Sequence, residues 1–171
     1  MDTGKAYADL IREKSKASFL KPLLGAWEFL PRPFQCFSDW QKDVAQLQQM
    51  AVWHQWVSVP NFENEIRLGK RAIIVTSPEQ HIEYVSSHFL GMTGYSSQEA
   101  LGKRPNFLQG KDTDPMAVQT VREAVKAKQP IQATILNYKK AGIPYLCEVN
   151  ILPLYNEAGV LSHFMALEQE V

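Results

Sequence analysis

The sequence has no excess charge of either sign. Its 171 residues include 18 Lys and Arg and 18 Asp and Glu, so the formal net charge is zero. A chain without an excess of positive charge offers no electrostatic footprint for nucleic acid or for an anionic membrane. We therefore expect neither nucleic acid nor membrane as a primary partner.

Cysteine is scarce, and metal-binding motifs are missing. Cys36 and Cys147 form no CxxC pair and no cysteine–histidine cluster, so neither a disulfide framework nor a structural zinc site is indicated. The four histidines also lack metal-ligand spacing, and we expect no bound metal and no haem. A reducing compartment fits this cysteine usage.

Long apolar runs and common catalytic motifs are also missing. The N-terminal residues include an early acid and no apolar run long enough for a signal peptide or a membrane span, so we expect a cytoplasmic protein. The sequence has no phosphate-binding loop, nucleophile elbow, metal-binding box or recognisable carboxylate pair. We therefore expect no enzyme.

The composition is that of a folded protein. Hydrophobic residues make up 45% of the chain and charged residues 21%, and the length suits one ordinary core with an extension. The pattern changes near Pro60, from helical spacing of apolar residues before it to short β-rich runs after it. We assign residues 1–60 to an N-terminal helical extension and residues 71–171 to the main domain.

Prolines interrupt the first part of the extension. The spacing predicts an amphipathic helix over Tyr7–Lys14, whose apolar face continues to Trp27, and Pro22 would kink or end it. Pro31 and Pro33 then predict an irregular linker.

A second helix is predicted after this linker. Ser38 and Gln41 have the spacing of a capping box, and the helix is expected to run to about Trp56. Its apolar stripe either docks on the chain's own domain or forms a dimer seam. Both alternatives stay open, because periodicity indicates that the stripe is buried and not which surface covers it. The stripe consists of Trp40, Val44, Leu47, Ala51 and His54.

The main domain alternates strands, turns and short helices. Helical segments are predicted over 86–93 and 96–101, and a longer helix starts at Asp114-Pro115 and ends before Pro130. The strands predict an α+β fold, a five-stranded antiparallel sheet with helices on one face and a pocket between the two. The predicted strands are 72–76, 82–85, 131–139, 145–154 and 160–167. Glycine-bearing hairpin turns at Lys140–Gly142 and Asn156–Gly159 are predicted to link the last three.

Several short motifs, among them Phe107 to Gly110 and Leu136 to Tyr138, together resemble the PAS domain family, in its light-oxygen-voltage (LOV) branch. The resemblance covers Arg71 to Val171 and implies the PAS fold and a sensory role. Phe107 to Gly110 with Thr113 to Pro115, and Leu136 to Tyr138, are the most LOV-like motifs. The others are 84–89, 92–95, 99–102, 121–124 and 139–142.

The resemblance implies a flavin site whose reactive group is replaced. Pro105 stands where LOV domains have the cysteine that bonds to photoexcited flavin, and proline has no thiol. Gln109, Arg122 and Asn137 match positions that hold the flavin ring edge and the phosphate of flavin mononucleotide (FMN). Amides suit the alternating donors and acceptors of the ring, and a guanidinium suits a phosphate.

Other positions of that site are changed. The replaced groups include two amides of the ring site and one phosphate-binding arginine, and each lost buried hydrogen bond would cost about 0.5–1.5 kcal/mol. A carboxylate at Glu168 must either protonate or repel the ring's carbonyl edge, or it is simply a solvated residue at the end of the chain. The changed positions are Arg104, Asn106, Tyr145, Leu146, Cys147, Ala166 and Glu168.

We therefore expect a non-catalytic PAS sensory module without a cofactor. It would act through protein–protein interaction or dimerisation, with a separate signalling protein or a second copy as partner. The alternative is a cysteine-less LOV photosensor that binds FMN through Gln109, Arg122 and Asn137 and signals by flavin photoreduction.

Overall fold

The computed structural model of the chain describes residues 32–68 and 71–171. Within this range, Cys36–Val171 forms one compact unit. The expected helix over Tyr7–Lys14, its continuation to Trp27 and the expected break at Pro31 lie outside the described residues. In the part that the structure describes, no helix is long and apolar enough to cross a membrane.

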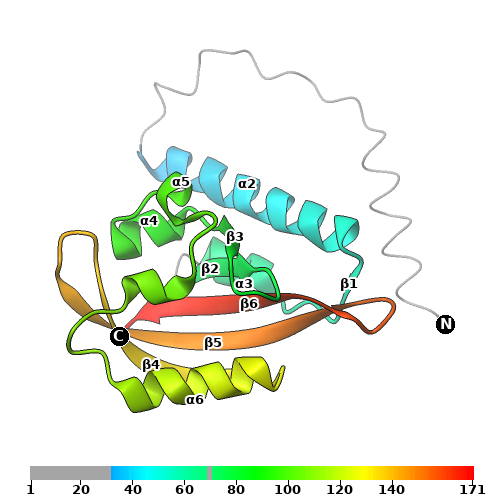
Figure 1. The fold of residues 1–171 in the computed structure, drawn as a ribbon. Coiled ribbons are helices and arrows are strands. Elements are labelled where there is room, and N and C mark those ends of the chain that lie inside the picture. The colour runs from blue at the N-terminus through cyan, green and yellow to red at the C-terminus, as the bar shows by residue number, and fades with distance from the viewer. Residues whose placement is uncertain (1–31, 69–70) are drawn as a thin grey trace. The chain divides into compact units, whose positions relative to one another are not determined.

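The centre of the molecule is a curled antiparallel sheet, which confirms the expected α+β fold (Figure 1). The order is β1-β5-β6-β2-β3, and β4 also pairs with β5. The two-residue strand β1 adds to the five predicted strands. The bounds are β1 Trp56–Val57, β2 Ala72–Thr76, β3 Ile82–Val85, β4 Ile131–Tyr138, β5 Pro144–Asn156 and β6 Leu161–Glu170.

The two hairpins that join β4, β5 and β6 lie where the turn residues predict them. Gly142 and Gly159 have φ angles of 78° and 74°, in the left-handed region that favours glycine. Asn156 Oδ1 accepts hydrogen bonds from the amides of Ala158 and Val160, at 3.0 and 2.9 Å. Local turn chemistry therefore sets the register of the three longest strands.

Four short elements cover one face of the sheet. They are α4 (His88–Thr93), α5 (Ser97–Ala100), the 3₁₀ turn η2 (Pro105–Leu108) and α6 (Pro115–Lys126). Asp114 caps α6 by accepting hydrogen bonds from the amides of Met116 and Ala117, as the Asp-Pro pair predicts. These elements and the sheet enclose a first core, which includes Ile74, Phe89 and Leu108.

Helix α2 (Arg32–Trp53) begins earlier and ends earlier than predicted. The prediction of a helix start at Ser38 was wrong, as was that of an irregular linker at Pro33, because Pro33 lies in the first turn of α2. A proline is tolerated there, since an amide in the first turn has no intrahelical acceptor. The short helix α3 (Phe62–Arg67) follows β1.

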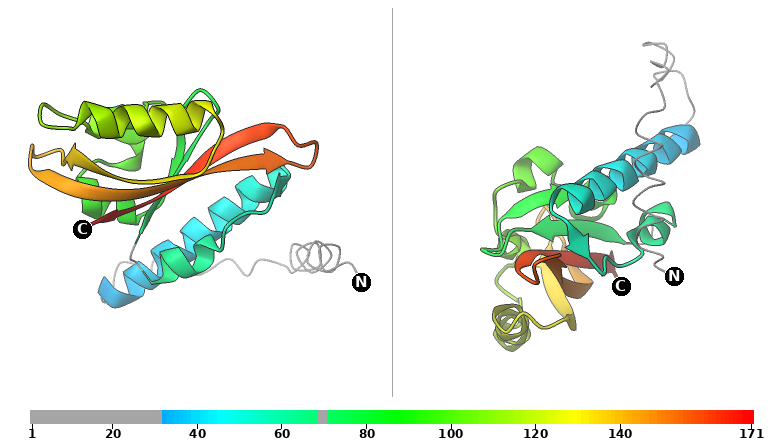
Figure 2. Two further views of the ribbon diagram at one scale, coloured as in Figure 1. Left: turned by 90° about the horizontal axis from the view of Figure 1, so that it is seen from below. Right: turned by 90° about the vertical axis from the view of Figure 1, so that its right-hand side faces the viewer.

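The apolar stripe of α2 packs on the second face of the sheet. Leu47 is fully buried in a second core with Ile73, Val75 and Met165, which alternate along β2 and β6 with the residues of the first core. Figure 2 shows α2 and α6 on opposite faces of the sheet. Helices therefore cover both faces, and not only the predicted one.

A buried carboxylate joins α2 to the sheet. Asp43 is 5% exposed, and its Oδ1 accepts a hydrogen bond of 2.7 Å from the Tyr84 hydroxyl. Its Oδ2 accepts hydrogen bonds from the Ser87 amide at 2.9 Å and the Ser87 hydroxyl at 2.6 Å. Burial and this carboxylate strongly raise the pKa of Tyr84, which therefore stays a hydrogen-bond donor.

Candidate functional site

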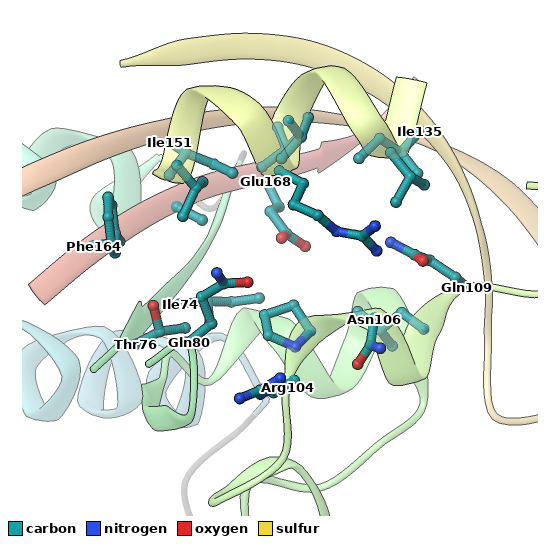
Figure 3. Close-up of a pocket in the computed structure, with 18 of the residues that line it drawn as sticks. Ile74, Thr76, Gln80, Arg104, Asn106, Gln109, Ile135, Ile151, Phe164 and Glu168 are labelled. Carbon is teal, nitrogen blue, oxygen red and sulfur yellow. The ribbon is translucent and has the colours of Figure 1, made fainter. Parts of the chain in front are cut away.

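A cavity of about 310 Å³ lies between the sheet and the elements η2 and α6 (Figure 3). This volume lies at the lower end of the range for small-molecule sites. Most of the wall is apolar, which suits the faces of a planar ligand. The apolar lining consists of Ile74, Pro105, Leu108, Val118, Val121, Val125, Ile135, Val149, Ile151, Phe164 and Ala166.

The three predicted ligand residues all line this one cavity. Gln109 follows η2, Arg122 lies on α6, and Asn137 lies on β4 and is 7% exposed. Arg122 is exposed, and its Nη1 donates a hydrogen bond of 3.3 Å to Gln119 on the same helix. Three elements thus bring two amides and one guanidinium to a common space.

The loop that carries Gln109 is tied to β4. The Thr113 hydroxyl donates a hydrogen bond of 2.6 Å to the Leu136 carbonyl and accepts one of 2.9 Å from the Gly110 amide. The Tyr138 hydroxyl donates a hydrogen bond of 2.7 Å to Asp112. A Cβ at Gly110 would meet the Tyr138 ring, so glycine permits this close approach and helps to position Gln109.

Some of the changed motif positions also face the cavity, whereas Tyr145, Leu146 and Cys147 are not part of its lining. Arg104, Pro105 and Asn106 belong to its lining, at the start of η2. No cysteine is among the lining residues in the described part of the chain. The pyrrolidine ring of Pro105 therefore occupies a place on the wall from which it can make only apolar contact.

Glu168 is part of the cavity wall and not a solvated end of the chain. It is 5% exposed, and Figure 3 shows its carboxyl group pointing into the cavity. The solvent-exposed interpretation was wrong because β6 continues to Glu170 and pairs Glu168 with Ala72 and Val149. Burial raises the pKa of Glu168 to about 7, and no cation among the described residues pairs with it.

A protonated Glu168 offers the same functions as an amide. Its hydroxyl donates one hydrogen bond and its carbonyl oxygen accepts others, as the two ends of a glutamine side chain do. The loss expected from replacing glutamine by glutamate at this position is therefore much smaller in the protonated form.

Two more buried polar groups lie near Glu168. The Cys147 Sγ is 3.7 Å from Glu168 Oε2, and burial followed by the nearby Glu168 strongly raises the pKa of this thiol. Such a thiol is a poor nucleophile. The Tyr145 hydroxyl is buried and has no hydrogen-bond partner within the described residues.

Sequence reasoning missed two polar residues of the lining. Thr76 ends β2, and Gln80 lies in the β2–β3 turn with a φ angle of 68°. The sequence predicted Thr76 only as the end of a strand and Gln80 only as part of the following turn. Figure 3 shows both side chains beside the cavity, next to Ile74 and Arg104.

Comparison with known proteins finds likeness in the same part of the chain. A family model described as "PAS domain" matches residues 70–171. A blue-light-activated histidine kinase 1 from Erythrobacter litoralis is 38% identical over 103 residues, which are 58% of this chain and 29% of that protein. The chain spans less than a third of the length of the curated relatives it matches.

Solved structures resemble the described fold. One is a light-oxygen-voltage domain studied with a flavin analogue, at a TM-score of 0.60 and 28% identity over 66% of this chain and 85% of that chain. Another is the LOV domain of the Erythrobacter litoralis EL346 blue-light activated histidine kinase, at a TM-score of 0.56 and 27% identity. It covers 59% of this chain and 95% of that chain.

Proposed function

The chain belongs to the PAS domain family, and we propose that it is a non-catalytic sensory module whose cavity holds FMN without a covalent bond. The observation that carries this proposal is the meeting of Gln109, Arg122 and Asn137 around one open, mainly apolar cavity. It departs from the sequence-based expectation of an empty module. The reason for this departure is the buried Glu168, whose protonated carboxyl group restores a hydrogen-bond donor and an acceptor to the ring site.

The lining residues fit the parts of FMN. Asn137 and protonated Glu168 can pair with the donors and acceptors of the ring's pyrimidine edge. Arg122 and Arg104 lie on the lining with positive charge for a phosphate. The apolar walls would exclude water from the ring. FMN, when bound, would supply absorption of blue light.

Pro105 excludes one reaction at this site. A cysteinyl bond to flavin needs a thiol at this position of the motif, and proline has none. A signal in this protein would therefore depend on changes in the hydrogen bonds of Gln109, Asn137 and Glu168 to the ligand. The blue-light-activated kinases among the relatives support a sensory role.

A second candidate is the ligand-free module that acts through protein contacts. It is favoured by apolar side chains exposed near the end of α2 and on β1, where Val52, Trp53 and Val57 are 60%, 77% and 42% exposed. Exposed apolar groups that lie together are typical of interaction surfaces. These exposed side chains would then contact a signalling protein or a second copy.

FMN and riboflavin titrations distinguish the two candidates, because riboflavin has the ring of FMN but no phosphate. We expect both flavins to bind and FMN to bind more tightly. Arg122→Gln should weaken FMN binding about 10-fold to 100-fold, since a hydrogen bond to a charged group contributes about 1.5–3 kcal/mol. The same change should leave riboflavin binding unaltered. Flavin fluorescence or equilibrium dialysis measures both constants.

Lys126→Gln is the matched control for this experiment. Lys126 is an exposed cation at the end of the same helix and is not part of the lining, so its loss should change neither constant. If neither flavin binds to the purified unsubstituted chain, the FMN proposal is wrong and the ligand-free module stands.

A further inference from the structure

Two histidines and a glutamate meet on the face of the sheet that lies away from the flavin cavity. His54 follows α2, Glu83 lies on β3 and His163 lies on β6. One possible ligand atom from each residue lies within 4.8 Å of the other two. The sequence shows no metal-ligand spacing among these residues, because they come from three elements far apart in the chain.

We propose that His54, Glu83 and His163 form a binding site for a divalent transition-metal ion of the zinc class. Imidazole nitrogen and carboxylate oxygen are the ligands that such ions share, and three protein ligands leave a position for water. Zinc–ligand bonds of about 2.0–2.2 Å place neighbouring ligand atoms about 3.3–3.5 Å apart. His163 Nε2 and Glu83 Oε2 are 3.1 Å apart, close to that spacing.

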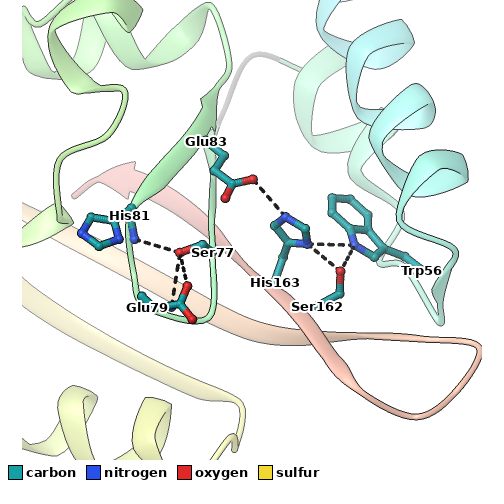
Figure 4. A network of polar contacts seen from close by, with 7 residues as sticks. All are labelled: Trp56, Ser77, Glu79, His81, Glu83, Ser162 and His163. Atoms are coloured by element: carbon teal, nitrogen blue, oxygen red, sulfur yellow. Dashed lines mark hydrogen bonds and ion pairs between the residues drawn. The ribbon is translucent and has the colours of Figure 1, made fainter.

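His163 is already oriented for this role. It is 4% exposed, and its Nδ1 lies 2.7 Å from the Ser162 hydroxyl and 3.2 Å from the Trp56 indole nitrogen (Figure 4). Its Nε2 points to Glu83. A second set of hydrogen bonds that fixes the ring of a histidine ligand is typical of metal sites.

The hydrogen bonds around His163 remain satisfied when a cation takes Nε2. The ring proton then lies on Nδ1 and can be donated to the Ser162 oxygen at 2.7 Å. The Trp56 indole can donate to the same oxygen, which lies at 3.1 Å. Because the Ser162 hydroxyl oxygen has two lone pairs, the imidazole N–H and the indole N–H both keep an acceptor.

The site is open to solvent on the side of His54 and Glu83. Both residues line a surface hollow of about 300 Å³ with the last two turns of α2. Glu83 is exposed and His54 is half-buried, 4.3 Å from His163 between ring centroids. Rotation of the His54 side chain can bring one of its ring nitrogens within bonding distance of a cation held by Glu83 and His163. A bound ion would tie the end of α2 to two strands of the sheet.

Cobalt(II) is the probe for this site, because four-coordinate cobalt absorbs strongly in the visible and the hydrated ion does not. The chain without an affinity tag should bind one Co²⁺ with such a spectrum, and Zn²⁺ should displace it. His54→Gln and Glu83→Gln each remove a metal ligand and should each weaken cobalt binding more than 100-fold. Ser162→Ala removes only a residue that orients His163 and should weaken binding by roughly 10-fold to 100-fold. Zn²⁺ should also raise the thermal unfolding midpoint of the unsubstituted chain but not of Glu83→Gln.

His81→Gln and His88→Gln are the control variants. Both histidines are exposed and stand outside the cluster, so the variants should keep the cobalt spectrum and the affinity of the unsubstituted chain. Glu83 is exposed, and its replacement leaves the core intact. Equal cobalt affinity in the unsubstituted chain and in Glu83→Gln, or a spectrum that remains that of the hydrated ion, would overturn the proposal.

Discussion

Glu168→Gln should stabilise the folded protein at pH 8 by up to about 3 kcal/mol and change its stability at pH 5 by less than about 1 kcal/mol. The pKa of Glu168 is raised from 4.5 to about 7 by burial. Between these two values the folded state binds more protons than the unfolded state, so stability falls as the pH rises. Glutamine has no such proton to lose, and its amide replaces the donor and the acceptor of the protonated acid.

Urea unfolding at several pH values between 5 and 8 measures this difference. The comparison between variant and unsubstituted chain removes the contributions of all other titrating groups. Glu157→Gln, in the exposed β5–β6 turn, is the control and should follow the unsubstituted chain at every pH. Parallel curves for Glu168→Gln and the unsubstituted chain would show that the carboxyl group is hydrated in the folded protein.

The protonation state of Glu168 should also affect flavin binding. A protonated acid can donate to a ring carbonyl, whereas the carboxylate can only accept. Flavin binding by the unsubstituted chain should therefore weaken as the pH rises through about 7, and Glu168→Gln should remove this dependence.

Asp43→Ala should lower the free energy of unfolding by about 2–5 kcal/mol. The substitution leaves the Tyr84 hydroxyl, the Ser87 amide and the Ser87 hydroxyl without the carboxylate that accepts their hydrogen bonds. Since Tyr84 is 7% exposed, water replaces the lost acceptor poorly. The effect is large because one residue of α2 satisfies groups on β3 and at the start of α4.

Asp39→Ala is the matched control, because Asp39 lies one turn earlier on α2 and forms an exposed ion pair with Lys42 at 3.5 Å. Its loss should change stability by less than about 1 kcal/mol. Asp43→Asn keeps one acceptor oxygen and should give an intermediate value if Asp43→Ala does not fold. A change below 1 kcal/mol in both Asp43 variants would contradict the proposed role of this carboxylate.

Features set by a few neighbouring residues were predictable from the sequence. The cap of α6 follows from Asp114-Pro115, and the hairpins follow from Gly142 and Gly159 with their neighbours. The motif positions of Gln109, Arg122 and Asn137 identified three residues of the cavity lining. Backbone conformation and side-chain direction along a strand are local properties, so a short stretch of sequence carries them.

The start of α2 shows where local signals compete. Ser38 and Gln41 have the spacing of a capping box, yet the helix already begins at Arg32. A capping box stabilises a helix start by about 1 kcal/mol, and the residues before it can continue the helix when a first-turn proline is tolerated.

The tertiary structure alone decided which polar side chains are buried and which residues far apart in the sequence come into contact. Glu168 near the end of the sequence reads as a polar terminus, and only its pairing in β6 between β2 and β5 places the carboxyl group in the cavity. His54, Glu83 and His163 come together only because α2 packs on the second face of the sheet. Both outcomes depend on which distant surfaces exclude water from a side chain. Local propensity and periodicity carry no information about which distant surface covers a given side chain.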